Sequence, residues 1–206
     1  MRSRQRAALA ALAVAFAASA CTFIADFPEP SPALSCPDHD DMVRLLGLGV
    51  CIDRYEASDV SGVTTSAAGP IPWSFVSYDE ATIACVDAGK RLCTPEWWLE
   101  ACQGQEHRAY PYGDSYEPDR CSDSTEASQV LRQTGELTGC EGGYPGLFDM
   151  SGNVAEWVER CDGDSCEARG GSYLSSGDHL SCSSSEQLDF QTQASQVGFR
   201  CCLVLP

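Results

Sequence analysis

Short apolar runs separated by glycines mark the first folded part of the chain. Between residues 42 and 55 the apolar positions fit short strands, and Gly47 and Gly49 interrupt them. The more polar stretch from Thr64 to Ile71 predicts a loop. This order places strands before the first helix.

The first helix has clear signals at both ends. Ser77 is followed three residues later by Glu80, which is the spacing of a capping box. The pattern stays helical to Ala88, and Gly89 stands where a helix end often needs a left-handed residue. The sequence therefore predicts one helix between Ser77 and Gly89.

A second helix is predicted to begin at Thr94. Thr94 suits the N-cap position, Pro95 suits the first helical position, and the pattern runs to about Cys102. Trp97 and Trp98 lie on this helix, where they could line a ligand groove. Their helical spacing indicates that at least one of them belongs to the core.

Beyond residue 103 the chain is rich in Gly, Ser and Asp and has only short apolar stretches. Such a segment buries little apolar surface, so it predicts irregular structure held by covalent bonds. The thirteen cysteines of the chain supply candidates for these bonds. Their number indicates an oxidising compartment.

The N-terminus has the layout of a secretory signal peptide over residues 1–20. Arginines precede an apolar, Ala-rich run, which is too short to span a bilayer. Cys21 follows the small residues of the cleavage region, which suits the lipid anchor of a bacterial lipoprotein, and plain secretion is the alternative. Residues 21–40 then read as a Pro-rich tether and residues 41–206 as one domain. We expect export to the bacterial periplasm or to the outer-membrane or cell surface.

The chain is strongly acidic. Its formal net charge is −17, and removal of three leader arginines would leave ten basic and thirty acidic residues, a mature charge of about −20. This charge repels nucleic acid and anionic lipid headgroups. We therefore expect no nucleic-acid partner, contact with a membrane only through the lipid anchor, and a monomer.

Six short motifs follow one another along the chain. They are CIDRYE at 51–56, AGKRLCTPEW at 88–97, YPYGD at 110–114, FDMSGNVAEW at 148–157, RGGSY at 169–173 and VGFRC at 197–201. Together they resemble the domain of formylglycine-generating enzymes, the sulfatase-modifying factor family. The resemblance implies an α+β, disulfide-stapled domain with little regular secondary structure and a C-type-lectin-like arrangement.

The resemblance also implies how several cysteines pair. Two family disulfides correspond here to Cys85–Cys201 and Cys102–Cys182. Cys121 with Cys140 would staple the next loop, and Cys161 with Cys166 would close a local turn. The pairing of the remaining four stays open: Cys36, Cys51, Cys93 and Cys202.

A calcium site is implied by the fourth motif. By the family match Asp149 and Glu156 would supply carboxylate oxygens, and Gly152 and Val154 would supply backbone carbonyls. An all-oxygen set of this kind suits a hard divalent cation. The alternative is a Gly- and Asn-rich turn entering a short strand, with Glu156 solvated.

The family's catalytic residues are missing. Its chemistry depends on two cysteines, separated by four residues, that follow the Gly-Gly-Ser-Tyr string and bind copper(I) for oxygen activation. Ser175 and Leu180 stand at these positions, and neither is a ligand for a soft monovalent metal, so copper is not expected. Cys161 and Cys166 have the same spacing but precede the string, so a relocated redox pair is the alternative to a local disulfide. His179 is read as an exposed loop residue, with a hydrolytic or metal-binding role as its alternative.

The sequence therefore favours a non-catalytic binding module, stabilised by calcium, whose ligand is a protein, a peptide or a glycan. One alternative is an oxidoreductase of the formylglycine-generating type that uses non-standard ligands or a relocated cysteine pair. Another is a purely structural protein of the bacterial envelope.

Overall fold

The computed structural model describes residues 36–125 and 129–206. The predicted signal peptide, the anchor residue Cys21 and most of the predicted tether lie outside the described residues. Within the described ranges, no helix has both the length and the apolar character needed to cross a membrane.

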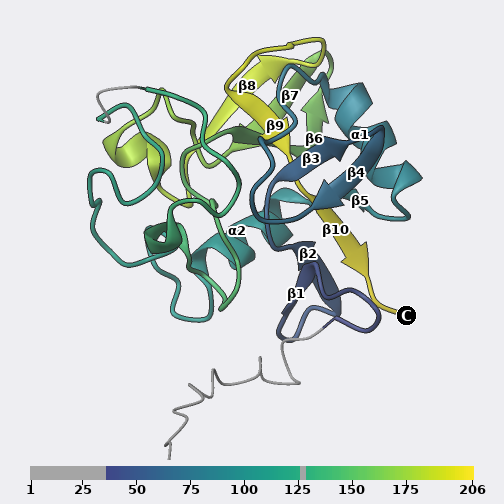
Figure 1. Ribbon diagram of the computed structural model, residues 1–206, viewed down its shortest axis with the longest axis horizontal. Coiled ribbons are helices and arrows are strands. Elements are labelled where there is room, and N and C mark those ends of the chain that lie inside the picture. Colours follow the sequence, from purple (N-terminus) through teal and green to yellow (C-terminus); the bar gives the residue numbers. More distant parts are fainter. Residues whose placement is uncertain (1–35, 126–128) are drawn as a thin grey trace, which may run out of the picture.

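The first sheet joins the two ends of the domain. Strands β1 (Met42–Leu45) and β2 (Val50–Asp53) form an antiparallel hairpin, as the apolar runs predicted. Strand β10 (Cys201–Val204) pairs with β2 on one side and with β5 (Arg91–Leu92) on the other. The sheet order is β1-β2-β10-β5, and Figure 1 shows β10 running out beside β2 to the C-terminus.

A separate hairpin corrects one prediction. Strands β3 (Ala57–Val60) and β4 (Val63–Ser66) pair with each other, so the first part of the predicted loop at Thr64 to Ile71 is a strand. The two threonines of β4 are β-branched, which favours extended backbone. The Thr65 hydroxyl also donates to the Ser58 carbonyl at 3.2 Å. The prediction was wrong because partner strand β3 lies in a segment that carried no alternating pattern.

Helix α1 (Tyr78–Asp87) has the predicted cap. The Ser77 hydroxyl accepts from the Glu80 backbone N–H at 3.3 Å, and the Glu80 carboxylate accepts from the Ser77 N–H at 2.8 Å. Past the end of the helix, Gly89 has a φ of 72°, in the left-handed region that favours glycine. Both ends of α1 are confirmed.

Helix α2 (Pro95–Gln103) confirms the second helix. The Thr94 hydroxyl accepts from the Trp97 N–H at 3.3 Å, which satisfies one of the free donors at the helix start. Trp98 is fully buried in the core, whereas Trp97 is partly buried and lies beneath the Arg91 guanidinium. The prediction that at least one tryptophan is core is confirmed.

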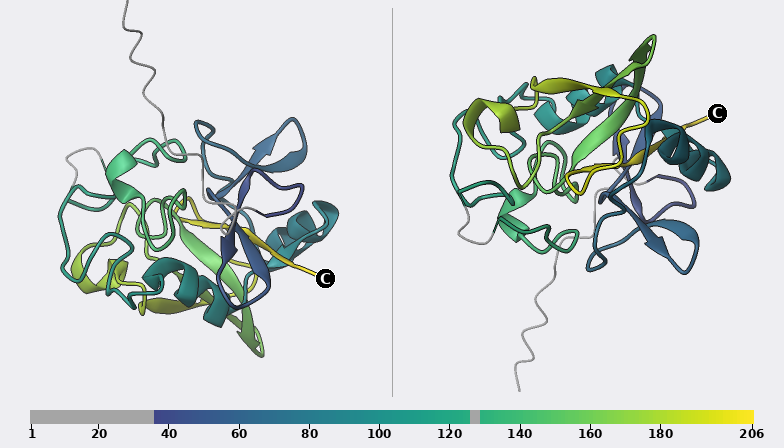
Figure 2. Two further views of the ribbon diagram at one scale, coloured as in Figure 1. Left: turned by 90° about the horizontal axis from the view of Figure 1, so that it is seen from below. Right: turned by 90° about the horizontal axis from the view of Figure 1, so that it is seen from above.

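The second sheet has the order β8-β7-β6-β9. Its strands are β6 (Ala155–Asp162), β7 (Ser165–Arg169), β8 (Ser185–Asp189) and β9 (Val197–Phe199). Strands β6 and β9 are parallel, and the other pairs are antiparallel. Within the described residues, the irregular structure predicted beyond residue 103 lies mostly in residues 104–125 and 129–154, which include the short 3-10 turn η2 (Thr138–Cys140). Figure 2 shows these long green loops gathered at one end of the domain.

Six disulfides cross-link the described chain. They include the four expected pairs, Cys85–Cys201, Cys102–Cys182, Cys121–Cys140 and Cys161–Cys166. The pairs left open by the sequence are Cys36–Cys51 and Cys93–Cys202. Cys36, inside the segment predicted as tether, is buried and bonded to Cys51 of β2. The domain is the disulfide-stapled α+β fold that the sequence predicted.

Candidate functional site

The turn after β7 carries the positions of the family's catalytic cysteines. Gly170 and Gly171 have φ values of 88° and 65°, and the chain then passes Ser175 to reach η3 (Gly177–Leu180). A Cβ atom on Gly171 would lie 2.5 Å from the His179 carbonyl oxygen. The glycine therefore allows the turn to pack directly against η3.

Neither replacement residue offers a metal ligand. The Leu180 side chain is 1% exposed, and its carbonyl accepts from the Ser151 hydroxyl at 2.7 Å. The Ser175 hydroxyl accepts from the Ser172 N–H at 3.1 Å, so it stabilises the turn itself. Leu180 has become a core residue and Ser175 a turn residue.

The hollow that remains at this turn is small. Its volume is about 60 Å³, and Ser175, His179 and Glu186 are among its lining residues. Ligand pockets usually hold about 300–1,000 Å³, so this hollow admits a water molecule or two and no peptide side chain or sugar ring. Burial raises the pKa of the Glu186 carboxyl, and the nearby His179 partly offsets the effect. His179 is exposed, as the favoured reading of the sequence had it.

The two cysteines of the alternative redox pair form a disulfide with each other. Cys161 and Cys166 are direct partners across the β6–β7 hairpin and are bonded to each other. Every other cysteine in residues 36–125 and 129–206 is also in a disulfide. A thiolate that could hold copper(I) is therefore absent from the described part of the chain.

The proposed calcium residues take part in a buried charge network. Glu156 is fully buried, and Arg200 contacts its two oxygens through Nε at 2.9 and 2.7 Å and through Nη2 at 2.6 Å. The Trp98 indole N–H donates to the same carboxylate at 2.7 Å. Three further donations from Arg200 reach the carbonyls of Asp53, Arg54 and Phe148.

Two other carboxyl groups lie in this network. Glu56, which the sequence reasoning missed, accepts from the Asn153 side chain at 2.7 Å and from the Val154 N–H at 3.1 Å. Burial and the charges of Asp149 and Glu156 raise its pKa well above the usual value. Burial also raises the pKa of Asp149 to about 6, and its carboxylate accepts from the Gly135 N–H at 2.6 Å. The signal for Glu56 was its place in the first motif, CIDRYE.

This arrangement does not fit Glu156 as a calcium ligand. Both of its oxygens are already bonded, and Arg200 stands where a cation would have to approach. The bidentate guanidinium and the Trp98 indole N–H are together the donors to this carboxylate. Among the described residues, no three His, Cys, Asp or Glu side chains converge as a metal site. Calcium at Asp149, Gly152, Val154 and Glu156 stays a prediction, and the geometry argues against the role of Glu156.

Residues 49–204 match the family described as the sulfatase-modifying factor enzyme 1-like domain. The chain belongs to this family. Among curated proteins it is 28% identical over 162 residues to the mouse (Mus musculus) formylglycine-generating enzyme, covering 63% of this chain and 43% of that protein. It is 29% identical over 170 residues to bovine (Bos taurus) inactive C-alpha-formylglycine-generating enzyme 2, covering 72% of this chain and 54% of that protein. The chain thus spans about half the length of the curated relatives it matches.

A solved structure supports the fold alone. Treponema denticola variable protein 1 superposes with a TM-score of 0.61 at 16% sequence identity, over 75% of this chain and 84% of that one. At this identity the likeness carries no information on activity. It agrees with the domain architecture that the six motifs implied.

Proposed function

We propose that this chain is a non-catalytic member of the sulfatase-modifying factor family that acts by binding a protein, a peptide or a glycan. One observation carries the proposal: every cysteine in the described residues is in a disulfide, while Ser175 and Leu180 stand at the family's copper positions. Copper(I) needs soft thiolate ligands, and these are absent from that site. The bovine relative named as inactive is a precedent in the family.

The proposal includes export. Six disulfides are typical of proteins that fold in an oxidising compartment. Cys21, after the signal-like leader, would be acylated and hold the domain at a bacterial membrane. Metabolic labelling with a fatty-acid analogue tests the anchor. Label should appear on the exported wild-type protein and be absent from Cys21→Ser, and label on both or on neither contradicts the anchor.

A copper titration separates this function from the oxidoreductase alternative. The purified, non-reduced protein is titrated anaerobically with copper(I) held by a competing chromophoric chelator. The result expected is no stoichiometric binding by the wild type. One tightly bound copper per chain, lost in a Cys161→Ser, Cys166→Ser variant, would overturn the proposal in favour of a relocated redox pair.

A direct assay complements the titration. The copper-treated protein is incubated in air with a cysteine-containing peptide, and mass spectrometry follows the peptide. We expect the cysteine to remain unconverted to an aldehyde, with an active formylglycine-generating enzyme as the positive control. Loss of the thiol with gain of an aldehyde would establish catalysis.

A further inference from the structure

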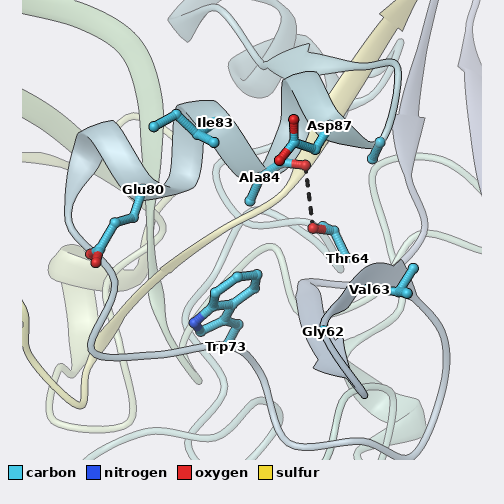
Figure 3. A pocket seen from close by; sticks show the side chains of 9 residues that line it. Gly62, Val63, Thr64, Trp73, Glu80, Ile83, Ala84 and Asp87 are labelled. Atoms are coloured by element: carbon cyan, nitrogen blue, oxygen red, sulfur yellow. Dashed lines mark hydrogen bonds between the residues drawn. The ribbon is translucent and has the colours of Figure 1, made fainter.

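A second and larger hollow lies between helix α1 and the β3–β4 hairpin. Its volume is about 390 Å³, which falls in the range of ligand pockets. Figure 3 shows the indole of Trp73 standing below the helix, with the hairpin at Gly62 and Val63 on the other side. Figures 1 and 2 place α1 and the hairpin at the end of the domain away from the yellow-green turn of residues 170–180.

The walls of this groove are fixed in place. The Thr64 hydroxyl donates to the Ala84 carbonyl at 3.2 Å, which joins the hairpin to the helix (Figure 3). The Trp73 backbone N–H donates to the Ala57 carbonyl at 2.8 Å, and its ring centroid lies 5.8 Å from that of the buried Phe199. A ligand would therefore meet a largely preformed surface, with little ordering cost.

The groove combines exposed apolar surface with negative charge. Val63 and Ile83 are 60% and 59% exposed on opposite walls. Glu80 and Asp87 stand two turns apart on the α1 wall, and no basic side chain is among the described residues that line the groove. Hydrogen bonds from Ser77 and Gln193 lower the pKa of the Glu80 carboxyl, and they hold one of its oxygens in place. An aromatic face between two carboxylates is suited to a cation.

We propose that this groove binds a segment of a partner protein in which an arginine or lysine is flanked by apolar residues. The basic side chain lies against Trp73 between Glu80 and Asp87, and the apolar neighbours pack on Val63 and Ile83. This inference rests on the proposed function in one respect: a protein that acts by binding needs a surface for its ligand. The site itself is separate from the replaced catalytic positions.

Charge decides between this occupant and two others. Residues 22–35 of the chain contain acidic residues and no Lys or Arg, so they do not complement the groove. A neutral glycan could donate hydroxyl hydrogen bonds to Glu80 and Asp87, but it gains nothing from their negative charge. It is therefore the alternative occupant that the test below distinguishes.

The test uses a fluorescent peptide of alternating leucine and arginine, and matched peptides with citrulline or glutamate in place of arginine. Fluorescence anisotropy measures binding to the full domain. Ile83→Ser removes apolar surface from the groove, whereas Val86→Ser, on the same helix and equally exposed at 59%, does not line it. Asp87→Asn removes one charge from the rim without touching the helix cap.

The arginine peptide should bind, and the citrulline and glutamate peptides should bind at least tenfold more weakly. Ile83→Ser should weaken binding about tenfold, since it removes most of a buried apolar side chain from the complex. Asp87→Asn should weaken it about threefold at low salt and less at about 0.15 M salt, whereas Val86→Ser should bind like the wild type.

Equal affinity of the Ile83 and Val86 variants would overturn the proposal, as would equal binding of the citrulline peptide or no binding of the arginine peptide. Binding of neutral oligosaccharides that is lost in Ile83→Ser would assign the groove to a glycan instead. A failure here leaves the copper result unchanged, whereas copper binding would refute the proposed function and leave the groove intact. The two inferences can thus fail separately.

Discussion

Glu156→Gln tests whether the fourth motif holds a guanidinium or a metal ion. The substitution keeps the size of the side chain and leaves an oxygen that can accept from Trp98. It removes the charge opposite Arg200, which is fully buried. Breaking one side of a buried ion pair costs about 3–5 kcal/mol.

The lower part of that range is expected, because Glu56 and Asp149 also interact with Arg200. A loss of about 3 kcal/mol in the free energy of unfolding lowers the melting temperature by about 6–12 °C in a domain of this size. Differential scanning calorimetry measures this drop, first with a calcium chelator and then with excess calcium. The same drop is expected in both conditions.

Glu159→Gln is the matched control on the same strand. Glu159 is exposed and pairs with the exposed Arg91, so its loss should cost less than about 1 kcal/mol. Our reasoning is refuted if Glu156→Gln melts like the wild type in chelator but abolishes a calcium-dependent rise in melting temperature. That result would identify Glu156 as a calcium ligand and would show that Arg200 is not its obligate partner.

Three further predictions follow from the cross-links and the helix cap. Removing Cys85–Cys201 or Cys93–Cys202 alone should lower the free energy of unfolding by about 3 kcal/mol, because the remaining disulfide leaves a ring of only about ten residues for the other to close. Removing both should lower it by about 8 kcal/mol. Chemical denaturation measures these losses, and a double loss equal to the sum of the two single losses would contradict the reasoning. Alkylation of the native, non-reduced protein should label no cysteine from residue 36 onward in mass spectrometry, and two labelled cysteines would indicate a reduced pair. Ser77→Ala should cost about 1 kcal/mol at pH 7. The cap lowers the pKa of Glu80, so part of the stability lost in Ser77→Ala depends on pH. That part is present above the normal pKa of a glutamate and is lost as the pH falls through the lowered pKa of the folded protein. The difference in melting temperature between wild type and Ser77→Ala should therefore narrow in acid, and a constant difference would show that the cap is not charge-assisted.

The elements that the sequence predicted correctly depend on residues close together in the chain. The capping box at Ser77 and the threonine–proline start at Thr94 act within one helical turn, so spacing alone identifies them. Two disulfide pairs, Cys85–Cys201 and Cys102–Cys182, followed from the family resemblance, because no local rule connects Cys102 to Cys182. Of the two pairs left open, Cys93–Cys202 needed the placement of β10 beside β5.

Some of the misses are local and others involve partners that are distant in sequence. Strand β4 pairs with its neighbour β3 across a short turn, in a segment that carried no alternating pattern, whereas the second sheet is completed by β9, which joins β6 in parallel from 42 residues away at Ala155 and Val197. From the local sequence, Glu156 is predicted to be either a metal ligand or a solvated carboxylate. Only the fold brings Arg200 to it, across 44 residues of chain.

The separation between scaffold and catalytic positions explains how this domain can keep its fold without the family's copper site. The long-range bonds that hold the domain include Cys85–Cys201, Cys93–Cys202 and the pair of Arg200 with Glu156, and none of these includes a replaced position. Cys102–Cys182 ends two residues after Leu180, but it too does not use that side chain. At the replaced positions, Leu180 adds buried apolar surface where a thiol would have been, which stabilises the turn rather than weakening it. A copper ligand at either of these positions would contribute to catalysis and not to the stability of the fold. A surface at the other end of the domain, such as the groove at Trp73, is not constrained by that chemistry, because its walls are α1, the β3–β4 hairpin and Trp73, and none of these carries a replaced catalytic position. Binding can therefore be the function of a scaffold in which a core side chain, Leu180, and a turn residue, Ser175, stand at the family's copper positions.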